Sequence, residues 1–162
     1  MTDPRHLFSV GPRSDLDPAV RAFRTALVLA RRLQASMDGV LRPAGLTTQQ
    51  AAVITAVVAL GSPSLAETAA ALGSTRQNVA QIVNALVRKG LLSSAPDPAD
   101  SRRLVLRATE ENAALWAGRD ADDHAVVAGW FSALDPAELE TFCALADRVL
   151  DRLDAADMAD QP

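Results

Sequence analysis

Apolar side chains recur every three or four residues along most of this 162-residue chain, which is the spacing of one face of an α-helix. Capping signals stand in front of these stretches: Asp17-Pro18, Thr47 with Gln50, Ser64 with Glu67, Ser74 with Gln77, Thr109 before Glu110, and Asp135-Pro136 with Glu138. The pattern predicts about six helices, at residues 18–41, 48–60, 65–72, 75–89, 110–131 and 136–155.

The helical spacing is interrupted after the fourth predicted helix. Two short strand-like runs, 91–94 and 103–107, flank the turn-rich stretch 95–100, which holds two prolines and two aspartates. Such a pattern is typical of a β-hairpin with a polar, stiffened tip. We therefore expect a hairpin at this place in an otherwise mainly α fold.

The third and fourth predicted helices carry the spacing of a helix-turn-helix. Ala69 is small where two helices would cross closely, and Gly73 can adopt the positive φ of a tight turn. Val79 and Ile82 would hold the second helix on the core. With the hairpin that follows, these positions predict a winged helix-turn-helix.

The fourth predicted helix has two different faces. One is apolar and consists of Val79, Ile82, Val83, Leu86 and Val87. The other carries amides and a cation, namely Gln77, Gln81, Asn84 and Arg88. Amide side chains can pair bidentately with adenine and arginine with guanine, so this face suits the reading of base edges. A merely solvated helix side is the alternative.

The net charge of −4 conceals a strong asymmetry along the chain. Residues 73–107 carry six basic residues against two acids, whereas residues 108–162 carry three arginines against thirteen acids. A basic island in an acidic protein indicates an electrostatic footprint confined to one surface. An acidic solvated tail beside an ordinary surface would give the same numbers.

The two ends of the chain carry apolar seams outside the predicted DNA-binding core. The first helix repeats apolar positions at spacings of three and four: Leu16, Val20, Phe23, Leu27, Ala30, Met37 and Leu41, with Gln34 as one polar interruption. The last helix has a comparable face: Leu139, Phe142, Cys143, Ala146, Val149, Leu150 and Leu153. We expect these helices to pair two subunits, although packing within one chain could also cover them.

The sequence gives no support to several other classes of protein. It has no phosphate-binding glycine loop, nucleophile elbow or metal-ligand spacing, so we expect no enzyme, cofactor or metal site. The longest apolar run, 51–60, is too short to cross a bilayer, and no targeting segment is visible, which favours a cytoplasmic protein. The lone Cys143 is expected to be structural rather than redox-active.

Four sequence motifs together resemble the MarR family of bacterial regulators. They are the run 46–50 (Leu-Thr-Thr-Gln-Gln), the turn 72–74 (Leu-Gly-Ser), the run 86–92 (Leu-Val-Arg-Lys-Gly-Leu-Leu) and the run 96–103 (Pro-Asp-Pro-Ala-Asp-Ser-Arg-Arg) with Thr109. The resemblance spans about residues 18–155. The chain departs from the family at Ala51, where an aromatic residue is common, and at Ser94, where a basic residue is common.

The resemblance implies a homodimeric winged helix-turn-helix repressor that binds a pseudo-palindromic operator and is released by a small molecule. It divides the chain into a flexible arm (1–16), a dimerisation helix (17–45), the DNA-binding domain (46–109), C-terminal dimerisation helices (110–155) and a flexible tail (156–162). By position, Arg102 corresponds to the family's minor-groove arginine and Asp100 to its acidic partner.

The expected DNA contacts combine the motif positions with the polar helix face. They are Ser64, Ser74, Thr75, Arg76, Gln77, Asn78, Gln81, Asn84, Arg88, Lys89, Asp100, Arg102 and Arg103. An effector pocket for an anionic aromatic compound would involve Arg31, Arg32 and Trp116, unless the arginines are solvated and Trp116 belongs to the core. A winged-helix module that binds protein, and a DNA-binding regulator without an effector, stay as alternatives.

Overall fold

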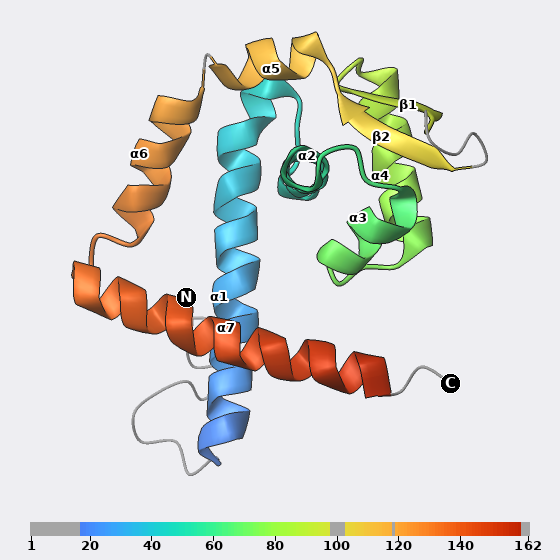
Figure 1. The fold of residues 1–162 in the computed structure, drawn as a ribbon. Helices are drawn as coiled ribbons and strands as arrows, with labels where there is room; N and C mark the ends of the chain where they lie inside the picture. The colour runs from blue at the N-terminus through green and yellow to red at the C-terminus, as the bar shows by residue number, and fades with distance from the viewer. Residues whose placement is uncertain (1–16, 98–102, 118, 160–162) are drawn as a thin grey trace, which may run out of the picture. The chain divides into compact units, whose positions relative to one another are not determined.

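The computed structural model describes residues 17–97, 103–117 and 119–159. The chain divides into two compact units, residues 1–117 (unit 1) and residues 118–162 (unit 2). The described residues of unit 1 form five α-helices, a 3₁₀ turn and a two-stranded antiparallel sheet (Figure 1): α1 (Pro18–Leu41), η2 (Arg42–Ala44), α2 (Thr48–Leu60), α3 (Leu65–Ala71), α4 (Arg76–Arg88), β1 (Leu92–Pro96), β2 (Leu104–Ala108) and α5 (Glu110–Ala117). This is the mainly α winged helix-turn-helix that the apolar spacing predicts.

The hydrophobic core of unit 1 joins the end of α1, α2, α3, α4 and the hairpin. Its buried side chains include Val53, Ile54, Val57, Ala69, Val79, Val83, Leu86, Leu92 and Leu106. Burying each of the larger of these contributes about 1.5–3 kcal/mol. The core therefore fixes α4 to the rest of the unit through one side of the helix and leaves its other side free.

The helix starts follow the capping signals, with one shift. Thr47 and Gln50 form a reciprocal capping box, and so do Ser64 and Glu67. In front of α4, however, the predicted pair Ser74 and Gln77 is wrong by one residue. The extended backbone of Thr75 places its hydroxyl where it accepts the Asn78 amide at 3.2 Å, so Thr75 is the N-cap.

The hairpin begins one residue later than the sequence predicts, because Leu91 still belongs to the end of α4. The Leu91 amide donates to the carbonyl of Leu86 at 3.0 Å, and Gly90 adopts a φ of 74°. Together these features form a Schellman cap. From Leu92 onward β1 pairs antiparallel with β2, with Leu92 opposite Ala108 and Pro96 opposite Leu104.

A third segment joins the base of the hairpin. The Leu106 amide donates to the carbonyl of Pro63 at 2.8 Å, and Ser64 forms an isolated bridge with Val105. The turn between α2 and α3 thus lies against β2. This backbone contact was not expected from the sequence, since the short segment has no strand-like pattern of its own.

The apolar seam of α1 divides into two parts. Leu41 is buried and Met37 packs against the core of unit 1, whereas Val20, Phe23 and Leu27 are exposed. Intrachain packing therefore covers the C-terminal part of the seam only. In the described residues no single helix is both long and apolar enough to cross a membrane; only the pair 18–44 and 48–60, bent by 82°, meets that test together.

Unit 2 consists of α6 (Asp120–Trp130) and α7 (Pro136–Ala159). The single helix predicted over 110–131 is thus two helices, because the backbone leaves the helical region at Arg119, where φ is −126°. Helix α7 continues beyond the predicted end at residue 155, so that part of the expected tail is helical.

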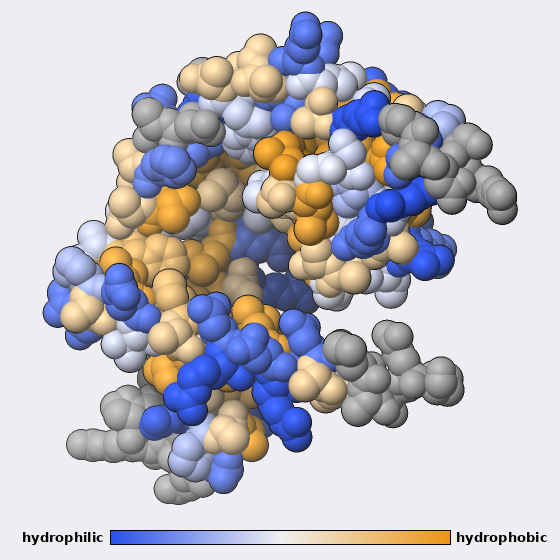
Figure 2. Space-filling view, in the orientation of Figure 1, coloured by the Kyte–Doolittle hydropathy of each residue, from blue (hydrophilic) through white to orange (hydrophobic). Residues whose placement is uncertain are grey.

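No described side chain of unit 2 is buried. The two rings of Phe131 and Phe142 lie 6.1 Å apart, while Leu145, Val149 and Leu153 of α7 are exposed. Hydrophilic side chains gather along the visible face of α7 (Figure 2). Cys143, expected within the apolar stripe, is also exposed. Unit 2 therefore has an apolar helix face without a buried core of its own among the described residues.

Candidate nucleic-acid interface

The turn between α3 and α4 has the geometry of a helix-turn-helix. Ala69 is buried, and its carbonyl accepts the Ser74 amide at 3.0 Å. Gly73 adopts a φ of 55°, in the left-handed region that the tight turn requires. Ala69 at the helix crossing and Gly73 in the tight turn thus have the roles that the sequence analysis predicts for them.

The polar face of α4 is exposed to solvent. Val79 and Leu86 are fully buried, while the opposite side presents Arg76, Gln77, Gln81, Asn84 and Arg88. Within the described residues none of these five side chains makes a hydrogen bond or ion pair. Val87, predicted to belong to the apolar stripe, is instead 40% exposed at its edge. The face offers free donors and acceptors along one side of a rigid helix.

The residues at the start of α4 are partly engaged with one another. Asn78 donates through its side-chain amide to the hydroxyl of Ser74 at 3.0 Å, and the Thr75 hydroxyl caps the helix. Because the cap uses Asn78 rather than Gln77, the Gln77 side chain is left free. The one-residue shift of the cap thus enlarges the free polar face.

Lys89 is held by the chain rather than free. Its ammonium donates to the carbonyl of Gly45 and to Oε1 of Gln50, the latter at 2.9 Å. Gln50 also closes the capping box of α2. Lys89 therefore ties the end of α4 to the start of α2, while its neighbour Arg88 stays exposed. Sequence reasoning placed both among the expected DNA contacts, because the fold that brings Gly45 to Lys89 is not visible in the local pattern.

Ser64, one of the expected DNA contacts, is half-buried and caps its own helix, α3. The amide and the hydroxyl of Ser64 donate to Oε2 of Glu67 at 2.7 and 2.8 Å, and these bonds lower the pKa of the Glu67 carboxyl. Arg103, which also donates to Glu67, lowers that pKa further. Glu67 is thus an anion at neutral pH that links the start of α3 to the hairpin.

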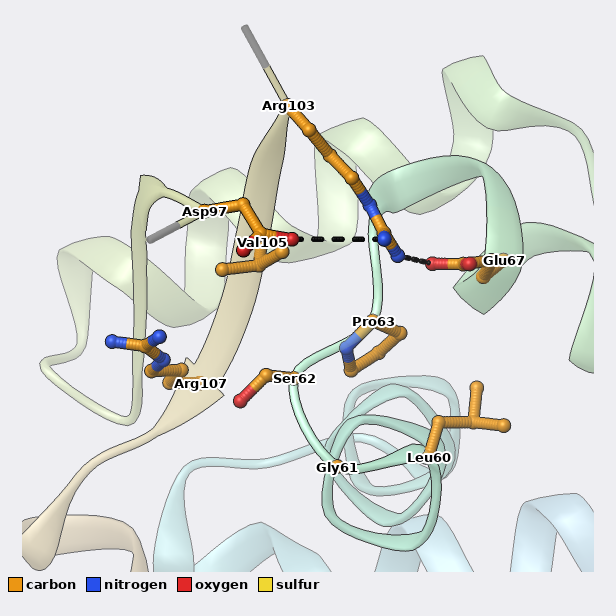
Figure 3. Close-up of a pocket in the computed structure, with 9 residues that line it drawn as sticks. All are labelled: Leu60, Gly61, Ser62, Pro63, Glu67, Asp97, Arg103, Val105 and Arg107. Carbon is orange, nitrogen blue, oxygen red and sulfur yellow. Dashed lines mark hydrogen bonds and ion pairs between the residues drawn. The ribbon is translucent and has the colours of Figure 1, made fainter. Parts of the chain in front are cut away.

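Arg103 bridges two carboxylates at the outer end of the hairpin. Its guanidinium donates to Glu67, and its Nη1 lies 3.6 Å from Oδ2 of Asp97 (Figure 3). The sequence placed Arg103 among the expected DNA contacts and indicated Glu67 only as the capping partner of Ser64. Asp100 and Arg102, the expected minor-groove pair, lie outside the described residues.

A cavity of about 390 Å³ is lined by residues of the hairpin and of the α2–α3 turn. Leu60, Pro63 and Val105 supply its apolar walls, and Glu67, Asp97, Arg103 and Arg107 its charged rim (Figure 3). Arg107 is a further exposed cation on β2 that the expected DNA contacts do not include. The charge island at residues 73–107 was the only signal that could have found it.

The residues expected to form an effector pocket do not line this cavity. Arg31 and Arg32 are exposed on α1. Trp116 is half-buried, packs against the core of unit 1 and donates through Nε1 to Oδ1 of the buried Asn112 at 2.9 Å. The contacts of Trp116 are those of a core residue with a satisfied indole N–H.

The fold and the free polar face of α4 define the class of the protein as winged helix-turn-helix. Residues 44–103 match the family model described as MarR family. This match confirms the resemblance to the MarR family that the sequence motifs indicated. Among curated proteins, no sequence match is found.

Solved structures share this fold. A MarR protein from Peptoclostridium difficile DA00132 gives a TM-score of 0.78 at 14% identity, over 93% of this chain and 96% of that chain. The S. aureus MepR–DNA complex gives 0.70 at 20%, over 80% and 94%. The PcaV transcriptional regulator from Streptomyces coelicolor, in complex with its natural ligand, gives 0.67 at 28%, over 85% and 97%.

Proposed function

We propose that the protein is a sequence-specific DNA-binding transcription regulator, and that it acts as a homodimeric repressor. The observation that carries this proposal is the free polar face of α4. Three amides and a terminal arginine stand along a helix whose other side is buried, and nothing in the described chain occupies them. A helix of this width enters the major groove, where such side chains discriminate base pairs.

Each expected contact then has a separable role. Gln77, Gln81 and Asn84 read base edges, and Arg88 lies near a base or an adjoining phosphate. Ser74, Thr75 and Arg76, at the start of α4, contact the phosphate backbone, because a helix N-terminus favours anions. At the hairpin tip, Arg102 enters the minor groove. Such groove contacts supply sequence preference, while the phosphate contacts supply affinity.

The homodimer is supported by the apolar surface that the chain leaves uncovered. Phe23 is 63% exposed on α1, and Val149 is 60% exposed on α7. Exposed apolar residues repeated along one face of a helix, at both ends of the chain, support an association surface. A two-fold dimer would read two half-sites separated by about one helical turn, or ~10 base pairs. Bound at a promoter, it would exclude polymerase.

Release by a small molecule is the remaining part of the proposal. The PcaV structure carries its natural ligand, which supports the presence of an effector in a relative of this fold. A ligand that changed the spacing of the two recognition helices would weaken binding, because the duplex fixes the half-site separation. The alternative without an effector differs only in this step.

The test is selection from random duplex DNA with the full-length protein, followed by gel-shift titration at two salt concentrations with unspecific competitor. We expect one enriched pseudo-palindromic sequence and a salt-sensitive, competitor-resistant complex. A rival protein-binding module would use the same helix face. The exposed Leu104 and Val87 would favour that rival, and the absence of any enriched sequence would support it.

A further inference from the structure

The outer end of the hairpin is attached to α3 through the side chain of Arg103. Arg103 is the first described residue after the tip, and Asp97 is the last described residue before it. The Asp97 amide donates to the carbonyl of Arg103 at 2.7 Å, and the Arg103 guanidinium reaches Glu67 of α3 and the Asp97 carboxylate (Figure 3). Both sides of the tip are therefore connected to Glu67 through one residue.

The base of the hairpin is held in a different way. There, the backbone of β2 pairs with the α2–α3 turn through the Leu106 amide and the bridge between Ser64 and Val105. These contacts do not depend on Arg103. The base would therefore keep its place if the outer contact were lost, and the hairpin would pivot rather than unfold.

A cavity lies beside this contact. It lies between the hairpin and the α2–α3 turn and is lined by Leu60, Pro63 and Val105 beneath the ion pairs. Beside this space, the contact between Arg103 and Glu67 joins the outer hairpin to α3.

We propose that Glu67 is a positioning residue for DNA recognition: by holding Arg103, it sets the angle at which the hairpin tip meets the minor groove beside the major-groove site. The inference rests on the proposed DNA-binding function and deepens it. The partner is the flanking double-stranded DNA, and Glu67 acts on it through the hairpin without touching it.

The sign of the expected effect separates positioning from simple charge. Glu67 is a carboxylate on unit 1, which would face the DNA phosphates. If electrostatics alone mattered, removing its charge should strengthen DNA binding. If Glu67 positions the hairpin, removing its charge should weaken binding instead. The two explanations predict opposite changes from the same substitution.

The structure offers a conservative variant and a matched control. Glu67→Gln keeps a side chain that can close the capping box with Ser64 but removes the ion pair. Because the pair is solvent-exposed, with 42% of the Arg103 and 53% of the Glu67 side chain accessible, its loss should leave the fold intact. Arg103→Gln and Arg107→Gln each remove one positive charge from the hairpin, and of these two arginines only Arg103 makes an ion pair within the described residues.

The first measurement is amide hydrogen exchange in the free protein. In Glu67→Gln and Arg103→Gln we expect the Asp97 amide to lose protection, while the Leu106 amide at the hairpin base and the Val83 amide in α4 stay protected. Arg107→Gln should resemble the wild type. Unchanged protection of Asp97 in both ion-pair variants would overturn the proposal, and it would do so without any DNA experiment.

The second measurement is hydroxyl-radical footprinting and titration on the operator selected with wild-type protein. Glu67→Gln should lose protection of the flanking minor grooves, keep the central major-groove pattern, and bind roughly fivefold or more weakly. Tighter binding with full flanking protection would overturn the positioning role. If the wild type selects no operator, the proposed function fails together with this inference, whereas the exchange data would still report on the contact between Arg103 and Glu67.

Discussion

Thr48 donates two hydrogen bonds to one carboxylate oxygen of Asp38, from its amide at 2.6 Å and from its hydroxyl at 2.7 Å. These bonds join α1 to the start of α2 and lower the pKa of Asp38. A carboxylate at a helix N-terminus also interacts favourably with the helix dipole. The junction between the two helices therefore depends on an ionised side chain.

We expect Asp38→Ala to lower the melting temperature at neutral pH and to lose this effect in acid. The folded-state pKa lies below the ordinary aspartate value, so the stabilisation is fully present above the ordinary value and disappears as the pH falls through the folded-state value. Thermal unfolding of wild type and variant across pH measures this. A difference that is equal at all pH values would show that the charge of Asp38 is unimportant.

Two adjacent cations should behave differently when each is replaced by methionine. Lys89→Met should reduce the free energy of unfolding by roughly 0.5–1.5 kcal/mol, because it removes the hydrogen bonds to Gly45 and Gln50. Arg88→Met should leave stability unchanged and reduce the slope of DNA affinity against salt by about one. Urea unfolding and salt-dependent titration measure the two effects. The opposite result would mean that Arg88 supports the fold and that Lys89 contacts phosphate.

Gly73 and Gly39 allow the same substitution to be compared in a tight turn and in a helix. Gly73 has a φ of 55°, so Gly73→Ala should destabilise the fold by roughly 1–2 kcal/mol. Gly39 lies inside α1 with open space around its Cα, so Gly39→Ala should stabilise it by roughly 0.5–1 kcal/mol. Chemical denaturation of both variants tests whether the backbone conformation, rather than glycine itself, decides the sign.

Gln81→Ala should change base preference more than overall affinity. A lost bidentate amide contact removes roughly 1–3 kcal/mol of discrimination at one base pair. Repeating the selection and comparing specific with unspecific dissociation constants measures the change. Gln49→Ala removes the same kind of exposed side chain from α2 and should have no effect. An unaltered preference in the Gln81 variant would mean that the reading face is wrongly placed.

Phe23→Glu should dissociate the proposed homodimer. Each symmetric dimer would lose two buried phenylalanine contacts, which together contribute roughly 3–6 kcal/mol, so the dissociation constant should rise at least about a hundredfold. Sedimentation over a range of concentrations measures it. Thr25→Glu introduces the same charge on the opposite side of the helix and should leave the dimer intact. A monomeric wild-type protein would contradict the dimer itself.

Local interactions made the recognition region predictable. The capping boxes at Thr47 and Ser64 and the turn at Gly73 join residues only a few positions apart, and α1 and α2 begin and end where the pattern predicts. The polar face of α4 follows from helix geometry alone. The misplaced cap at Thr75 shows the limit, because Ser74 and Thr75 are chemically equivalent candidates one residue apart.

The sequence by itself determined most of the elements, the helix-turn-helix and the free face that supports DNA binding, but not the break between α5 and α6. Only the tertiary structure decided that Lys89 is tied to Gln50 and that Arg103 is held by Glu67, contacts that span 39 and 36 residues. It also decided which half of the α1 seam is buried. The physical reason is that capping and periodicity act within a turn or two of the chain, whereas the partner of a long charged side chain is set by how distant segments pack.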